Sequence, residues 1–211
     1  MNVNYDILFQ QIQNGIDVNN PPKLLLHACC APCSTSCLTR VLPFFDVTLY
    51  FSNDNITNSA EHEKRLCEVK KLVDTVNGGN FEIQPLRPLK LVAPNANSDN
   101  FYNAAKGLEK EREGGARCAV CFRLRLSNTR DYAACNGFDL FGTTLTVSPY
   151  KNSQTLNEIG LSLQTDELRW LTADFKKHNG YNESIRLSNK YGLYRQHYCG
   201  CEFSLQQTTV K

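Results

Sequence analysis

The amino-acid sequence predicts an α/β fold, in which a single domain contains an open, mostly parallel sheet with helices on both faces. Short apolar runs alternate along the chain with segments whose apolar residues recur at helical spacing, and this alternation is typical of parallel sheets. No repeat, low-complexity tract or linker divides the 211 residues, so we expect one domain over residues 1–211. Hydrophobic residues make up 41% of the chain and charged residues 21%, which excludes a disordered protein.

The first half of the chain is expected to contain three strands. A helix over 5–16 ends before Pro21 and Pro22, so residues 1–22 form an N-terminal helical extension. Pro32 suits the first turn of a helix, and Asn58 is a suitable N-cap for the next one. The expected elements are, in order, a strand over 24–26, a helix over 32–42, a strand over 47–51, a helix over 58–76 and a strand over 81–86.

The second half continues the alternation and ends in a cysteine-bearing tail over 194–211. Gly114 and Gly115 break the helical pattern, and Gly137 is a suitable C-terminal cap. We expect helices over 99–111, 118–134, 153–163 and 181–191, and strands over 138–141 and 170–172. Ligands of such sheets bind where the strands end, and the cysteines after the first strand and the segment 142–151 fall at such positions.

Ten cysteines in a chain whose N-terminus lacks a secretory signal indicate a reducing compartment. We therefore expect a cytoplasmic protein whose thiols serve metal binding or redox chemistry. No apolar run approaches the roughly 18 residues that cross a bilayer, so no membrane partner is expected.

Three cysteine groups carry the chemistry. Cys29, Cys30 and Cys33 lie in a strand-to-helix turn, Cys118 and Cys121 form a C-x-x-C at a predicted helix start, and a C-x-C ends the chain's last motif. Two groups at helix N-termini favour a shared metal site built from four soft thiolates, which suits zinc or an iron–sulfur cluster. We favour iron–sulfur because these ligands lie at the functional end of a self-sufficient sheet, whereas four-cysteine zinc usually staples a small, loop-rich unit. Structural zinc and a purely thiol–disulfide function remain alternatives.

The C-x-C pair, Cys199 and Cys201, allows two interpretations. A disulfide between them would close a small, strained ring that is readily reduced, as a redox relay requires. The alternative is that both are additional metal ligands or inert thiols. His197 lies in the same motif and is a candidate proton donor.

The other cysteines and His27 are expected to be structural. Cys37 follows Cys33 by one helical turn and is expected to be a small buried hydrophobe, and Cys67 and Cys135 are expected in the core. His27 ends the first strand and is expected to be a packed, hydrogen-bonded residue.

Basic residues concentrate in two segments that also contain cysteines. Residues 117–130 hold four arginines and no acid, and residues 176–197 hold five lysines or arginines against Glu183. One interpretation is a set of solvated helix faces, and the other is a basic surface that binds a phosphate backbone. The candidate RNA-binding residues are Arg117, Arg123, Arg125, Arg130, Lys190 and Arg195.

Several common motifs are missing. The sequence contains no G-x-x-x-x-G-K-[ST] phosphate loop, no G-x-G-x-x-G dinucleotide turn and no G-x-S-x-G nucleophile elbow. P-loop NTP hydrolysis, Rossmann-type nicotinamide binding and serine hydrolysis are therefore disfavoured.

Four motifs together resemble one known family. Residues 27–34 (HACCAPCS) resemble the N-terminal motif of QueH-type epoxyqueuosine reductases, and residues 107–126, 143–152 and 194–201 resemble their later motifs in the same order. The resemblance spans residues 24–204. One segment differs, because residues 51–56 read FSNDNI where the family is expected to read closer to F-Y-N-P-N-I.

The resemblance implies an oxidoreductase for the last step of queuosine biosynthesis, reducing the epoxide of epoxyqueuosine at the wobble position of tRNA to an alkene without cobalamin. It implies a [4Fe-4S] cluster, for which Cys29, Cys30, Cys118 and Cys121 are the candidate ligands, and an adjacent metal, expected to be iron, with Cys33 as its ligand. The implied fold resembles the nucleotide α-hydrolase-like (HUP) domains of tRNA-thiolating enzymes.

The implied reaction needs electrons and a proton donor. An electron donor such as a ferredoxin or flavodoxin is expected as a partner, besides the tRNA. Cys199 and Cys201 would pass electrons in or complete the coordination. Tyr150, Lys151 or His197 would protonate the leaving oxygen.

Two other functional classes stay open at this point. An ATP-dependent tRNA-thiolating enzyme of similar fold needs a glycine-rich S-G-G-x-D-S loop after the first strand, and residues 27–34 contain no glycine. An electron carrier or a zinc-stabilised RNA-binding module is the non-enzymatic alternative.

Overall fold

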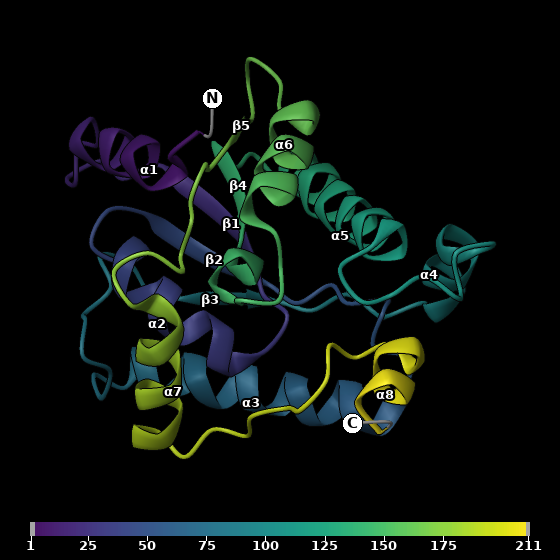
Figure 1. The fold of residues 1–211 in the computed structure, drawn as a ribbon. Coiled ribbons are helices and arrows are strands. Elements are labelled where there is room, and N and C mark those ends of the chain that lie inside the picture. The colour runs from purple at the N-terminus through teal and green to yellow at the C-terminus, as the bar shows by residue number, and fades with distance from the viewer. Residues whose placement is uncertain (1–2, 210–211) are drawn as a thin grey trace.

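The computed structural model describes residues 3–209 and the side chains of residues 3–206 (Figure 1). In chain order the elements are α1 (Tyr5–Asn14), β1 (Lys23–His27), α2 (Ala31–Val41), β2 (Asp46–Tyr50), α3 (Ser59–Asn77), β3 (Lys90–Val92), α4 (Ser98–Ala105), α5 (Ala116–Cys135), β4 (Leu140–Thr143), the 3-10 helix η1 (Thr144–Val147), α6 (Ser153–Leu163), β5 (Arg169–Trp170), α7 (Gly180–Lys190) and α8 (Glu202–Thr209).

The strands form one sheet in the order β3-β2-β1-β4-β5, and every pair of neighbours among the described strands is parallel. The predicted α/β class is therefore confirmed. Strand β1 lies at the centre, where its neighbours β2 and β4 lead to opposite halves of the sheet, with Leu26 beside Leu49 and Gly142. Such a reversal in strand order opens a crevice at the carboxyl ends of the strands.

Helices cover both faces of the sheet (Figure 1). Leu24 and Leu26 point to one face and pack in a core with residues of α2 and α3, while Leu25 points to the other and packs with residues of α5 and α6. All three leucines are fully buried, as the alternation of side chains along a central strand requires. On the second face Gly160 of α6 lies directly on Trp170, where an added Cβ would come within 2.1 Å of the indole.

The expected third strand is wrong. Residues 81–86 are not a strand, and β3 forms at Lys90–Val92, where Lys90 is registered with Thr48 of β2. Pro85 and Pro88 interrupt the intervening segment, and neither can donate a ladder hydrogen bond. Phe81 instead packs its ring against Tyr191, which follows α7, with centroids 5.3 Å apart.

Most other boundaries differ from expectation by a few residues. Helix α4 ends at Ala105 rather than at residue 111, because Gly107 adopts a positive φ of 82°. Helix α5 begins at Ala116, so Cys118 and Cys121 lie in its first two turns, as the C-x-x-C spacing indicated. Helices η1 and α8 were not expected. Among the described helices, none is long and apolar enough to cross a bilayer.

Candidate metal centre

The first cysteine group lies at the carboxyl end of β1. Cys30 is the N-cap of α2 and makes no side-chain capping bond, so its thiol is free to face the crevice. The sulfurs of Cys29, Cys30 and Cys33 all lie within 4.8 Å of one another, and Cys29 Sγ is 3.7 Å from Cys30 Sγ. We call these three residues the α2 thiol group. Three soft ligands this close together could hold a metal ion.

Hydrogen bonds among the three thiols shift their pKa values in opposite directions. Hydrogen bonds from the thiols of Cys30 and Cys33 hold the pKa of Cys29 well below its ordinary value. Burial, above all, raises the pKa of Cys30 to about 12. The pKa of Cys33 is also raised, because its thiol is hydrogen-bonded to Cys29 and Cys30. The group therefore favours a single negative charge, and a bound metal would displace the remaining protons.

The second group combines the C-x-x-C of α5 with the C-x-C of the tail. Cys118, Cys121, Cys199 and Cys201 line one small cavity, although 78 residues separate Cys121 from Cys199 in the sequence. We call these four residues the α5–tail group. Burial raises the pKa of Cys121 to about 12 and that of Cys201 to about 11, while Cys118 Sγ accepts a hydrogen bond from Gly114 N at 3.2 Å.

Arg65 of α3 holds the tail in place. Its guanidinium donates from Nη1 to the carbonyl of Cys199 at 3.0 Å and from Nη2 to that of Tyr198 at 3.2 Å. Nε donates to Glu61 at 2.7 Å, and the side chain is 1% exposed. The tail is further tied at Gly200, whose carbonyl accepts from Thr57 N at 3.3 Å. These contacts set the position of Cys199 and Cys201.

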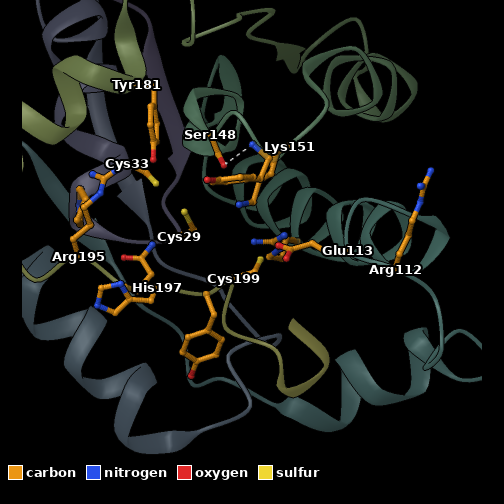
Figure 2. Close-up of a pocket in the computed structure, with 15 residues that line it drawn as sticks. Cys29, Cys33, Arg112, Glu113, Ser148, Lys151, Tyr181, Arg195, His197 and Cys199 are labelled. Carbon is orange, nitrogen blue, oxygen red and sulfur yellow. Dashed lines mark hydrogen bonds between the residues drawn. The ribbon is translucent and has the colours of Figure 1, made fainter. Parts of the chain in front are cut away.

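A cavity of about 490 Å³ opens beside both groups (Figure 2). Cys29 and Cys199 face it from the two groups, and Lys151 and Arg195 lie on opposite sides of it. The complete lining is Cys29, Pro32, Cys33, Arg112, Glu113, Arg125, Ser148, Tyr150, Lys151, Tyr181, Arg195, Gln196, His197, Tyr198 and Cys199.

Two cations offset the charge of thiolates in this cavity. Burial lowers the pKa of Lys151, but the sulfurs of Cys199 and Cys29 outweigh it, so the net pKa is raised. Arg125 is 1% exposed and borders both the large cavity and the small one. The site therefore suits an anionic centre.

The structure brings part of the expected site together in the large cavity, but Cys118 and Cys121 do not line it and share the small cavity with Cys199 and Cys201. Tyr150, Lys151, His197 and Arg195 line the large cavity with Cys29, Cys33 and Cys199. Tyr150 stands at the rim with 75% of its surface exposed.

Burial corrects the RNA-binding set. Arg117 and Arg125 are each 1% exposed, so neither presents a guanidinium to a polyanion at the surface. Arg117 donates to backbone carbonyls, including that of Glu109 at 2.8 Å. Of the others, Lys190 is exposed and bonded to Glu82, and Arg130 is half-buried and ion-paired with Asp131. Arg123 is exposed, and Arg195 lines the large cavity.

The expectations for the structural residues are only partly confirmed. Cys37 and His27 are fully buried, and His27 bonds with Thr143 Oγ1 at 2.9 Å and Ser52 O at 3.2 Å. Burial lowers the pKa of His27 to about 3, so the ring is neutral. Cys67 and Cys135 are exposed rather than in the core, because each lies on the solvent side of its helix.

Sequence reasoning missed several residues of the site. Arg65 lies on a strongly charged helix, where an arginine is normally solvated, and nothing in its local sequence indicates burial. Gln196 donates from Nε2 to Cys30 Sγ at 2.9 Å, a contact across 166 residues. Its place inside the tail motif was the available signal.

Residues 51–56, which differ from the expected family pattern, are held in place by side-chain hydrogen bonds. Asp54 is 4% exposed, and its carboxylate accepts hydrogen bonds from Asn97 N and Asn100 Nδ2, both at 3.0 Å. These bonds tie the loop after β2 to the start of α4. Next to it, Asn53 donates to the carbonyl of Ala28 at 2.9 Å, beside the α2 thiol group.

Known proteins of one family are similar to this chain. The family model described as epoxyqueuosine reductase QueH matches residues 24–207. A protein of Streptococcus pyogenes serotype M1 named epoxyqueuosine reductase QueH is 38% identical over 210 residues, which cover 99% of this chain and 80% of that protein. Proteins of the same name are 37% identical in Staphylococcus epidermidis, covering 99% of this chain and 87% of the relative, and 33% identical in Thermotoga maritima, covering 89% and 93%.

Proposed function

Because the chain belongs to the QueH family of epoxyqueuosine reductases, we propose that its cysteine-lined cavity is the site where the epoxide of epoxyqueuosine, at the wobble position of tRNA, is reduced to the alkene of queuosine. The protein is thus an oxidoreductase of tRNA modification. The observation that carries the proposal is that Cys29 and Cys33 of the α2 thiol group and Cys199 of the α5–tail group line one cavity, which is large enough for part of a nucleoside.

Removing the epoxide oxygen takes two electrons and two protons and releases water. The electrons would come from a one-electron carrier such as a ferredoxin or flavodoxin. Cys199 lines both cavities and Cys201 lines the small one, and we assign these two tail cysteines the relay that passes electrons inward.

The residues fit an iron–sulfur cluster, since the donor set is soft, largely buried and accompanied by two cations. Cys29, Cys30, Cys118 and Cys121 would hold a [4Fe-4S] cluster, and Cys33 would hold an additional iron ion, without cobalamin. When bound, the cluster would supply electrons, and the additional iron ion would supply the electrophile for the epoxide oxygen, because four cysteine ligands leave no iron of the cluster open.

The rest of the cavity would bind and protonate the substrate. A base of the anticodon loop can leave its stack and enter such a pocket, as single-stranded RNA permits. Arg195 lies with its guanidinium carbon 5.3 Å from the ring centroid of Tyr181, which gives a cationic, flat wall for a nucleotide. Lys151 would stabilise developing alkoxide charge, and Tyr150 or His197 would deliver the proton.

The direct test is anaerobic incubation of the purified protein with epoxyqueuosine-containing tRNA and a reductant, followed by mass analysis of digested nucleosides. Conversion to the product lacking one oxygen is expected. No conversion by iron-loaded protein would contradict the proposal.

Cys201→Ser tests the relay, and Cys67→Ser, at an exposed cysteine outside the site, is the matched control. We expect Cys201→Ser to lose turnover but keep its iron, and Cys67→Ser to keep both. Full turnover of Cys201→Ser with a protein reductant would remove the relay role, and loss of iron would indicate a ligand instead.

A further inference from the structure

Among the side chains of residues 3–206, Arg125 is a buried cation without an acidic partner. It lies one helical turn after Cys121 on α5 and is 1% exposed. Its Nε donates to the carbonyl of Cys121 at 3.3 Å, and its guanidinium carbon is 5.6 Å from the ring centroid of Phe122. Nη2 is buried and has no hydrogen-bond partner among the described residues, and no carboxylate in residues 3–206 lies within ion-pair distance of it.

An uncompensated guanidinium in the interior is strongly unfavourable, so its retention indicates that a negative charge faces it in the loaded protein. The groups that act on Arg125 electrostatically are sulfurs. They include Cys121 and Cys199 of the α5–tail group and Cys29 of the α2 thiol group. Arg125 also borders both the large and the small cavity, so it lies between the two cysteine groups.

Arg117, another buried arginine of α5, has a different environment. Its Nη1 donates to the carbonyls of Leu108, Glu109 and Glu111, and its guanidinium carbon is 4.8 Å from the ring centroid of Phe203. These contacts fix the loop that precedes α5. Nε and Nη2 of Arg117 are buried without a hydrogen-bond partner as well, and both arginines line the small cavity. Of the two, however, only Arg125 also lines the large cavity, beside Cys29 and Cys33, and its Nε bond to the Cys121 carbonyl leaves Nη2 unpartnered there.

We propose that Arg125 is a positioning residue whose guanidinium donates a hydrogen bond to the sulfur-rich anion enclosed by the two cysteine groups and thereby raises its reduction potential. This inference rests on the proposed function. Reduction adds negative charge to the centre, and a nearby fixed cation and hydrogen bonds to its sulfurs stabilise that reduced state. An arginine suits this position because its planar fork bonds the Cys121 carbonyl and a second acceptor at once, which an ammonium cannot do in the same geometry.

The test compares Arg125→Met, Arg125→Lys and the control Arg123→Met, whose parent side chain is exposed on the same helix. Each protein is loaded anaerobically with ferrous iron and sulfide. Iron and sulfide per chain are then counted, and the midpoint potential is measured by a spectroscopic redox titration.

We expect Arg125→Met to bind less iron or to have a lower potential, and Arg125→Lys to change in the same direction by less. A tenfold loss in stability of the reduced centre is about 59 mV for one electron. Arg123→Met should match the parent.

Parental iron content and potential in Arg125→Met would overturn the inference. If circular dichroism shows that Arg125→Met does not fold, Arg125→Lys decides, and a parental potential in that variant overturns it. If the parent loads iron and the two Arg125 variants show these shifts, but the parent leaves epoxyqueuosine unreduced, the proposed function is contradicted and the role of Arg125 is not.

Discussion

Gly200 lies between the two tail cysteines, and Gly200→Ala, which adds a single methyl group, should undock the tail from the metal centre. Its φ is +127°, a backbone conformation that residues with a Cβ rarely adopt. A Cβ built there would lie 2.9 Å from Ile56 Cγ1 and 3.3 Å from Arg65 Nη1. Ile56 is 2% exposed, so it has little room to move away. Gly200→Ala therefore combines backbone strain with a clash.

The two costs can be added as an order of magnitude. The strained backbone costs about 1–3 kcal/mol, and overpacking a filled interior costs about 1–3 kcal/mol more. Even the lower sum, about 2 kcal/mol, changes the docking equilibrium of the tail by about thirtyfold. The tail docks through the bonds from Arg65 to Cys199 O and from Thr57 to Gly200 O, and these bonds are outside the sheet. We therefore expect the tail to undock while the sheet stays folded.

Two measurements check this expectation. Native-state hydrogen exchange should show lost protection at the Thr57 amide, with strand amides protected as in the parent. Iron content after anaerobic loading should fall, because an undocked tail opens the small cavity that the candidate ligands Cys118 and Cys121 line. Gly79→Ala is the matched control, because Gly79 also has a positive φ, of 74°, but no atom lies within 4 Å of its added Cβ. It should cost only the left-handed strain, about 1–2 kcal/mol, and keep its iron. Parental Thr57 protection and iron content in Gly200→Ala would refute the reasoning.

Three further predictions follow from the site and its supports. Cys118→Ala should bleach the anaerobically loaded protein and lower its iron and sulfide content. Cys135→Ala, at an exposed cysteine of the same helix, should change neither the colour nor the content. Retained iron and sulfide in Cys118→Ala would remove Cys118 from the ligand set. Arg195→Ala should weaken tRNA binding and reduce the slope of log affinity against log salt by roughly 0.7 for one lost phosphate contact, in gel-shift titrations at several salt concentrations; an unchanged slope would contradict a phosphate contact. Asp6→Asn should lower the unfolding free energy by about 1–3 kcal/mol at pH 7, because the carboxylate of Asp6 bonds Arg40 at 2.7 Å and His178 at 2.9 Å. Burial raises the pKa of Asp6, but Arg40 and His178 lower it by more, so the pKa in the folded state is below the ordinary value of 3.8. The stabilisation by the Asp6 carboxylate is therefore present above pH 3.8 and is lost as the pH falls below that value. Urea titrations of metal-free protein should show the difference in unfolding free energy between parent and variant narrowing below that pH, and a constant difference would contradict the ionic origin.

Local patterns in the sequence were sufficient for much of the fold. The apolar run from Leu24 to Leu26 predicted a strand, and a C-x-x-C placed after two glycines predicted the start of α5. The expected strand over 81–86 is wrong, because that prediction relied on hydrophobicity although Pro85 lies inside the range. Strand β3 has only three residues, and its position is decided by pairing with β2, a contact across some forty residues.

Part of the candidate site could likewise be predicted from local sequence patterns, and part depended on tertiary packing. The cysteine motifs could be selected from spacing, since each motif places its thiols through the local geometry of a turn or a helix. Lys151 was selected from the family resemblance and Arg195 from the basic segment 176–197. Whether an arginine faces water or sulfur depends on which helix face the rest of the chain covers. Arg123 and Arg125 lie two residues apart, yet one is exposed and the other is buried between two cysteine groups.

By itself, the sequence determined the alternation of strands and helices, the thiol groups and their likeness to one enzyme family, because these depend on neighbours along the chain. Only the tertiary structure decided that Cys118, Cys121, Cys199 and Cys201 line one cavity, that Arg65 holds the tail, and that Arg125 carries its charge inside. The physical reason is that packing sets burial and charge environment, and packing joins residues whose separation in the sequence carries no local pattern.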